Sequence, residues 1–269
     1  SVAGFAFLHD FAITPNYCVF VQNPVSFNPM PFVFGFKGAA ECIQFNPKKP
    51  TKIVVIPRNG TDEVRFFDTD PCFVFHHANA FEQDGKLILD SVCYDRFQTL
   101  DDEEDYSTVD FDHVPASQLW RFTVNLTTEK VSVEKLVERP CEFPTLHPKH
   151  VGRPYRYLYL GATHGPVKNA PLQALIKRDM QTGEEQFWSA APRGFAGEPL
   201  FVARPNGSAE DDGWVLLWIY NAACDRTEIT IFDAQDITPG PIATLKLKHH
   251  IPYGLHGSFT KQYFGPDAI

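Results

Sequence analysis

The stretch Cys72-Phe73-Val74-Phe75-His76-His77-Ala78-Asn79-Ala80-Phe81-Glu82 is rich in aromatic residues and carries two adjacent histidines. Aromatic and β-branched residues favour strands, so this composition predicts one here. Asp84-Gly85 follows, a pair typical of a tight hairpin turn, and residues 86–92 form an apolar partner for the first strand. We therefore expect a β-hairpin with an imidazole buried in it.

The two histidines of this strand have different expected surroundings. Side chains alternate across a strand, so His76 and His77 point to opposite faces and at most one shares a site with Val74 and Ala78. A single histidine on an apolar strand is more often a hydrogen-bonded core residue than a metal ligand. A functional role for either one depends on residues elsewhere in the chain.

Composition predicts a mainly β protein that does not bind nucleic acid. The 269 residues, 43% of them hydrophobic, suffice for one large domain or two ordinary ones. The 24 basic and 33 acidic residues give a net charge of −9, which argues against a nucleic-acid partner. Phenylalanine is abundant and the 22 prolines outnumber the 17 glycines, a mixture that favours short strands and fixed turns.

The six cysteines are scattered without a CxxC pair, which suits reduced, buried thiols better than a disulfide framework. No apolar run reaches the roughly 20 residues of a membrane-spanning helix. The chain opens at Ser1 without a methionine, and residues 1–8 read as a strand-like apolar run. We expect the sequence to be a piece of a longer protein.

Short strands recur along the whole chain with turn signals between them. We expect strands at 17–22, 52–57, 64–68, 73–81, 86–94, 119–125, 131–136, 155–161, 172–177, 186–189, 199–203, 213–220, 227–233 and 242–246. This pattern predicts a sandwich, a barrel or a propeller. At four strands per blade, a propeller made from them has about three to four blades, too few for a closed ring.

Residues 23–38 interrupt this pattern with an apolar insertion that contains three prolines and four phenylalanines: Phe27, Phe32, Phe34 and Phe36. Too broken for a core strand, the insertion is either a loop packed on the core or an exposed patch that enters a membrane leaflet or lines a tunnel mouth.

A third histidine lies near the end of the chain. Glycines on both sides, Gly254 and Gly257, let backbone and ligand approach His256 closely. His9, at the end of the first apolar run and before a turn, is well placed to face a cavity. These histidines are too far apart in sequence for a local metal motif, so only the fold can bring His9, His76 and His256 together.

Five segments, taken together and in order, resemble the carotenoid cleavage oxygenases over essentially the whole chain. They are His9–Thr14, Phe75–Glu82, Cys141–Pro144 with residues 151–157, Glu198–Val202 with residues 210–214, and Pro252–Gly257. The resemblance implies one domain over residues 1–269: an incomplete C-terminal part of an all-β, seven-bladed β-propeller, with about three to four or more blades and with dome loops.

The resemblance also implies a metal centre. In this family four histidines hold one Fe(2+) per chain on the propeller axis; His9, His76 and His256 match three of them, and His77 takes a neighbouring non-ligand position. The fourth ligand and the N-terminal blades would lie upstream of Ser1. Glu142 and Glu198 match two glutamates that orient ligand imidazoles, and a carboxylate in that place fixes the tautomer and the ring angle.

The function implied is a non-haem Fe(II)-dependent dioxygenase. It would use dioxygen to cleave a C=C bond of a carotenoid or apocarotenoid into carbonyl products. One alternative is stilbene cleavage or retinoid isomerohydrolase-type activity. A second is a catalytically inactive propeller fragment that binds lipids or a protein.

By the same resemblance, Phe27, Phe32, Phe34 and Phe36 lie at the tunnel entrance and make peripheral membrane contact. We expect a monomer in a plastid (chloroplast) or the cytoplasm, although no transit peptide is visible in the sequence.

Overall fold

The computed structural model describes residues 4–97, 110–111, 113–166, 169, 171–252, 254–263 and 265. At its centre is the predicted hairpin, in which β7 (Phe73–Gln83) pairs antiparallel with β8 (Lys86–Tyr94). Asp84 and Gly85 both have positive φ, 49° and 72°, as a two-residue turn of this kind requires. The hairpin is confirmed.

Four antiparallel sheets of four strands follow one another along the chain, and each strand pairs with the next one in its sheet. The first sheet is β1 (Ala12–Ile13), β2 (Tyr17–Gln22), β5 (Thr51–Pro57) and β6 (Arg65–Thr69). The second is β7, β8, β9 (Ser117–Asn125) and β10 (Val131–Val137). The third is β11 (Cys141–Thr145), β12 (Tyr157–Ala162), β13 (Ala174–Asp179) and β14 (Glu185–Ser189). The fourth is β15 (Gly194–Ala203), β16 (Gly213–Asn221), β17 (Arg226–Asp233) and β18 (Ala243–Lys246).

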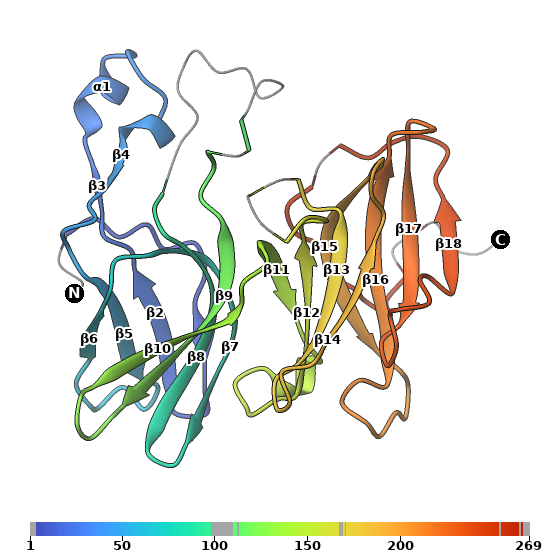
Figure 1. Cartoon of the computed structure of the whole chain (residues 1–269). Coiled ribbons are helices and arrows are strands. Elements are labelled where there is room, and N and C mark those ends of the chain that lie inside the picture. Colours follow the sequence, from blue (N-terminus) through green and yellow to red (C-terminus); the bar gives the residue numbers. More distant parts are fainter. Residues whose placement is uncertain are drawn as a thin grey trace.

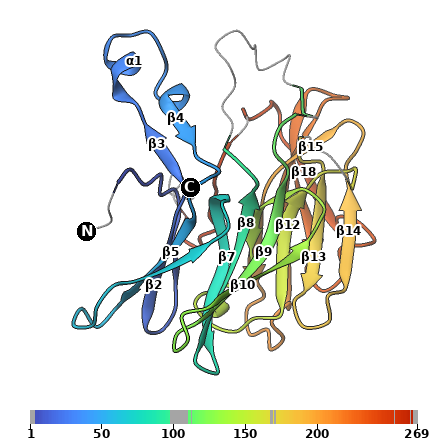
Figure 2. The ribbon, with the colours of Figure 1, turned by 60° about the vertical axis from the view of Figure 1, so that its left-hand side comes forward.

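The first strands of the four sheets lie next to one another. β1 contacts β7, β7 contacts β11, and β11 contacts β15. The sheets therefore fan out from a common axis like the blades of a propeller (Figures 1 and 2). The β-propeller prediction is confirmed, and the described residues form four blades; a complete ring of seven remains what the resemblance implies.

The core lies between neighbouring blades, in three apolar clusters. Val19 and Phe122 meet between the first two blades. Leu119 and Leu158 meet between the second and third. Tyr159 packs with the fourth blade, so neighbours on β12 serve opposite faces of their sheet. This packing fixes each inner strand relative to the next.

The insertion in the first blade projects away from the sheets (Figures 1 and 2). It comprises β3 (Val25–Phe27), the short helix α1 (Pro29–Val33), the 3₁₀ turn η1 (Ala40–Cys42) and β4 (Ile43–Phe45). The side chains of Phe32, Phe34 and Phe36 are 50%, 63% and 77% exposed. The tip of the insertion is thus largely exposed, as expected for the second alternative, whereas Phe27 at its base is only partly exposed and stacks on Phe5 with ring centroids 5.4 Å apart. None of the helices in the described part of the chain is both long and apolar enough to span a membrane.

Most predicted strands are present within a few residues of their expected bounds. The short strands β1, β3 and β4 were not predicted, and the sequence failed in three further places. β11 was not expected, because Pro144 in a five-residue segment argues against a strand. β15 begins five residues earlier than predicted, because Gly194 and Gly197 read as breaks. A strand was expected at residues 1–8, but residues 4–8, the part that the structure describes, do not form one. All six cysteines are free, as expected, but only four are buried: Cys18 is partly exposed and Cys224 is exposed.

Candidate metal centre

Two β-bulges in β7 set the direction of His76. One extra residue is inserted between Val74 and His77, and a second between His77 and Asn79. A bulge redirects the side chains beside it, and here Phe75 and His76 both face a cavity on the axis. His77 is half-buried, lines a second cavity beside the axis and shares a 2.7 Å hydrogen bond with Ser91 Oγ. Burial lowers the pKa of His77 to about 4, so its ring is neutral at physiological pH.

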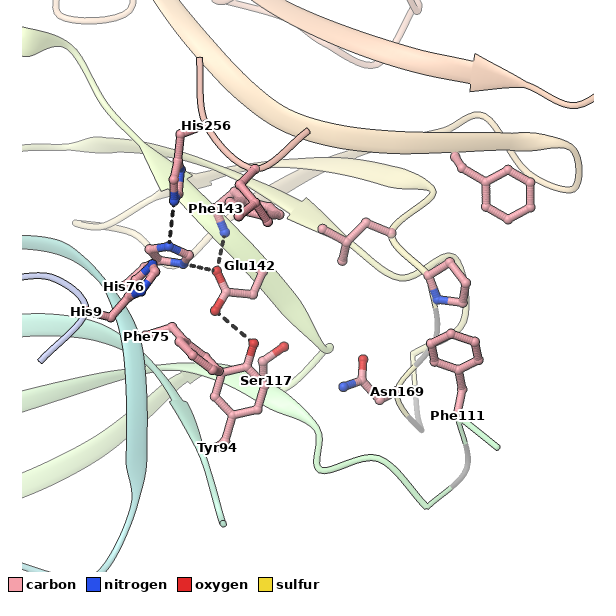
Figure 3. A pocket seen from close by; sticks show the side chains of 14 residues that line it. His9, Phe75, His76, Tyr94, Phe111, Ser117, Glu142, Phe143, Asn169 and His256 are labelled. Carbon is pink, nitrogen blue, oxygen red and sulfur yellow. Dashed lines mark hydrogen bonds and ion pairs between the residues drawn. The ribbon is translucent and has the colours of Figure 1, made fainter. Parts of the chain in front are cut away.

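The three histidines singled out in the sequence meet on the axis (Figure 3). His9 lies just before β1, and His256 on the extended segment that follows β18. Ring centroids are 5.1 Å apart for His9 and His76, and 5.0 Å apart for His76 and His256. One ring nitrogen from each residue lies within 4.8 Å of the other two. The structure thus assembles the set that the sequence could only propose.

Glu142, on β11, holds His76. Its Oε2 accepts a 2.6 Å hydrogen bond from His76 Nδ1 and another of 2.6 Å from the Phe143 backbone N–H. Its Oε1 accepts a 2.9 Å hydrogen bond from the Tyr94 hydroxyl. Burial lowers the pKa of His76, but the hydrogen bond and the charge of Glu142 outweigh it and raise the pKa overall. Both oxygens of this buried carboxylate are therefore occupied.

Glu198, on β15, holds His256 in a similar way. Its Oε1 lies 3.1 Å from His256 Nδ1, and its Oε2 accepts a 2.8 Å hydrogen bond from the Gly257 N–H. The His256 side chain is 47% exposed, compared with 15% for His76. The carboxylate fixes both the ring and the backbone of an otherwise open segment.

Each of these glutamates also sits beside a bulge. The register of β11 shifts between Glu142 and Thr145, where Phe143 has a positive φ of 54°. The register of β15 shifts between Ala196 and Pro199, next to Glu198. Bulges are common beside active sites because they re-aim side chains. Three inner strands thus depart from regular pairing where they face the axis.

Asp10 connects two of the histidine segments, a role that sequence reasoning missed. Its Oδ2 accepts a 2.9 Å hydrogen bond from the backbone N–H of His77, and its Oδ1 accepts one of 2.7 Å from the N–H of Phe11. The carboxylate satisfies a donor in the bulged part of β7 and fixes the segment that carries His9. The only sequence signal was an acidic residue directly after a candidate ligand.

The residues present fit a metal ion bound through imidazole. His76 Nε2 and His256 Nε2 are 3.3 Å apart, close to the roughly 3 Å between two nitrogens at right angles on a metal with bonds of about 2.1 Å. The Nδ1 atoms of both rings face carboxylates, which leaves the Nε2 atoms for a metal. Burial, followed by the neighbouring His76 and His256, lowers the pKa of His9 and favours its neutral, coordinating form. Imidazole ligands suit iron, zinc, copper and nickel.

An apolar cavity of about 610 Å³ opens beside the histidines. Its walls include Phe75, Tyr94, Phe143, Phe195 and Leu255. Figure 3 shows the histidines at one end and Phe111 and Asn169 toward the other. A second cavity, of about 440 Å³, shares the three histidines and Phe143 but is also lined by Asp10 and Glu198. The first cavity suits an elongated apolar molecule.

Comparisons with known proteins point to one family. The profile of the family described as retinal pigment epithelial membrane protein matches residues 1–261. The chain is 55% identical over 258 residues to the apocarotenoid-15,15'-oxygenase of Synechocystis sp., covering 96% of the chain and 52% of that protein. It is 30% identical to a carotenoid cleavage oxygenase of Mycobacterium tuberculosis, covering 96% of the chain and 59% of that protein.

A solved structure agrees with these matches. The cobalt-substituted Synechocystis oxygenase superposes with a TM-score of 0.94 at 54% identity, over 96% of this chain and 54% of that one. The chain therefore spans about half the length of these relatives.

Proposed function

Because the chain belongs to the family of the carotenoid cleavage oxygenases and retinal pigment epithelial membrane protein, we propose that the protein carrying it is a non-haem Fe(II) dioxygenase. It cleaves a C=C bond of a carotenoid or apocarotenoid into two carbonyl products. The observation that carries this proposal is the convergence of His9, His76 and His256 at one end of an apolar, aromatic cavity.

In this proposal His9, His76 and His256 hold the iron, whose contribution when bound is to activate dioxygen for the oxidative step. Both atoms of O₂ end in the two carbonyl groups, so the reaction balances without an external reductant. Neutral imidazoles suit this role because they leave the positive charge of the metal uncompensated. Glu142 and Glu198 keep the proton on Nδ1 of His76 and His256, so that Nε2 faces the metal.

The cavity walls bind and orient the substrate. Phe75, Phe143 and Tyr94 present ring faces and edges to it, and such rings hold a conjugated chain by dispersion. Their quadrupoles also stabilise positive charge that develops on the polyene as the double bond reacts. The apolar lining excludes water from the reacting carbons.

Product analysis tests the proposal. The intact protein that carries this chain is purified without oxygen, loaded with Fe(II) and given ¹⁸O₂ with apocarotenoids, stilbenes and a retinyl ester. Cleavage of an apocarotenoid to two labelled carbonyl products, lost in His76→Ala, supports it. Cleavage of stilbenes alone, isomerisation of the ester, or a protein that retains no iron contradicts it in favour of the corresponding alternative.

The exposed tip of the insertion supports a peripheral membrane contact for a monomeric protein. Phe32, Phe34 and Phe36 are at least half exposed and offer apolar surface to the surroundings, and Phe34 and Phe36 contact each other. A water-insoluble substrate can then pass from the bilayer to the cavity. Localisation in a plastid or the cytoplasm stays a prediction, which cell fractionation tests.

A further inference from the structure

Tyr94, the last residue of β8, links the cavity wall to the proposed metal centre. Its ring lines the apolar cavity and packs edge-on against Phe75, with ring centroids 5.6 Å apart. Its hydroxyl donates a 2.9 Å hydrogen bond to Oε1 of Glu142, whose other oxygen binds His76. One side chain therefore touches both the space for the substrate and the carboxylate that orients an imidazole.

The hydroxyl matters because Glu142 is buried, with only 8% of its surface exposed. A buried carboxylate oxygen without a donor is costly, so loss of the hydroxyl would make the carboxylate rotate or admit water. Either change moves Oε2, which shares a 2.6 Å contact with His76 Nδ1. Burial and the charge of Glu142 raise the pKa of Tyr94 well above its ordinary value, so the hydroxyl keeps its proton and remains a donor.

Glu198 provides a contrast. Among the described residues it is bound by His256 itself and by the adjacent Gly257, on one exposed segment. Glu142 instead receives donors from three strands, namely His76 on β7, Tyr94 on β8 and Phe143 on β11. His76 is thus held by a network that spans two blades, and Tyr94 is its contact with the cavity.

We propose that Tyr94 is a positioning residue for the metal centre: its hydroxyl fixes Glu142, and Glu142 fixes the ring of His76. The inference rests on the proposed function, because it presumes that the three histidines bind a metal. It goes beyond that function because it gives Tyr94, a residue of the cavity wall, a role in orienting the metal-binding ring of His76.

The test uses the intact protein loaded with Co(II), whose visible absorption bands report ligand geometry without turnover. Tyr94→Phe removes the hydroxyl and keeps the ring. We expect the bands to change and the affinity for Co(II) and Fe(II), measured by chelator competition, to fall about tenfold, the low end for loss of a group that orients a ligand. Tyr155→Phe is the matched control, because the buried Tyr155 hydroxyl donates a 2.6 Å hydrogen bond to Asp90 instead. It should lower thermal stability and leave the bands unchanged.

A double-mutant cycle separates positioning from general structural damage. If Tyr94 acts through Glu142, Tyr94→Phe has little further effect on metal affinity once Glu142→Gln is present. Full, additive effects of the two substitutions would overturn the inference, as would unchanged bands and affinity in Tyr94→Phe. A wild-type protein without cobalt bands would instead refute the metal centre, and both proposals with it.

Discussion

His76 and His77 are neighbours in sequence and differ in chemistry because of what surrounds each ring. Burial lowers the pKa of His77 and keeps its ring neutral, and Ser91 shares a hydrogen bond with it. His76 faces the axis, where Glu142 accepts a hydrogen bond from its Nδ1–H and Nε2 is left directed at two other imidazoles. The hydrogen-bond partners and the burial of each histidine therefore decide whether it belongs to the candidate site, more than the residue type does.

Glu82, near the end of β7, has a carboxylate that connects this strand to the first blade. It accepts hydrogen bonds of 2.6 Å from Thr14 Oγ1, 2.8 Å from Asn16 Nδ2 and 3.1 Å from Asn16 N. Burial raises the pKa of Glu82, but these hydrogen bonds outweigh it and lower the pKa below the ordinary 4.5. The ionised group thus contributes stability above pH 4.5, and this contribution disappears as the pH falls through the lower pKa of the folded state.

We expect Glu82→Gln to reduce the free energy of unfolding by about 1 kcal/mol at pH 7, because a neutral amide accepts more weakly and the site is partly screened by solvent. Urea unfolding at pH 7 and at pH 3.5 measures the difference. The difference in unfolding free energy between wild type and variant should be smaller at pH 3.5, because below pH 4.5 the unfolded state binds a proton more readily than the folded state does. An equal gap at both values would contradict this account of the carboxylate.

Among the single strands, the bulges explain which strand bounds could be predicted from the sequence and which could not. Strands such as β2 and β8 have regular alternation and tight turns, and their bounds were predicted to the residue. β11 was missed because Phe143 and Pro144 do not suit a regular strand, and the first half of β15 because of its glycines. The irregular segments are those that carry Glu142 and Glu198, so local propensity fails where the site imposes its own geometry.

Gly197 in the bulge of β15 is predicted to be intolerant of a side chain. A Cβ built on it would overlap the indole of Trp218. We expect Gly197→Ala to cost about 1–3 kcal/mol through overpacking and, by displacing the adjacent Glu198, to weaken metal binding. Thermal unfolding and metal titration measure the two effects.

Gly254→Ala is the control for this prediction, because a Cβ there meets nothing within 4 Å. It should change stability by no more than about 0.5 kcal/mol. A Gly197→Ala protein as stable as wild type, with unchanged metal affinity, would show that the close approach of β15 to Trp218 is not needed.

In the molecule as a whole, the candidate metal centre is built from segments that are far apart in the chain. His9 comes from the segment before β1, His76 from the second blade and His256 from the extended segment after β18. The spacing of these histidines in the sequence could not predict that they meet. Their convergence was predicted from the order of five motifs that resemble a known family. Tyr94 and Asp10 were not identified, because their roles lie in hydrogen bonds across strands that a single sequence does not reveal.

The insertion of the first blade gives a prediction at this scale. Replacing Phe32, Phe34 and Phe36 with Ser removes exposed apolar surface, so binding of the intact protein to liposomes should fall at least about tenfold, since each buried ring contributes more than 1 kcal/mol. Co-sedimentation measures the binding to liposomes. The iron content is the control, and it should stay constant because the substitutions lie far from the three histidines. Unchanged sedimentation would remove the insertion as the membrane contact.

We propose that three distant imidazoles bind one metal ion on the propeller axis. An anomalous difference map at the iron edge, from crystals of the intact protein prepared without oxygen, tests it directly. We expect a single peak about 2.1 Å from a ring nitrogen of each of His9, His76 and His256. A map with no peak at that point, or with iron bound elsewhere, would contradict it.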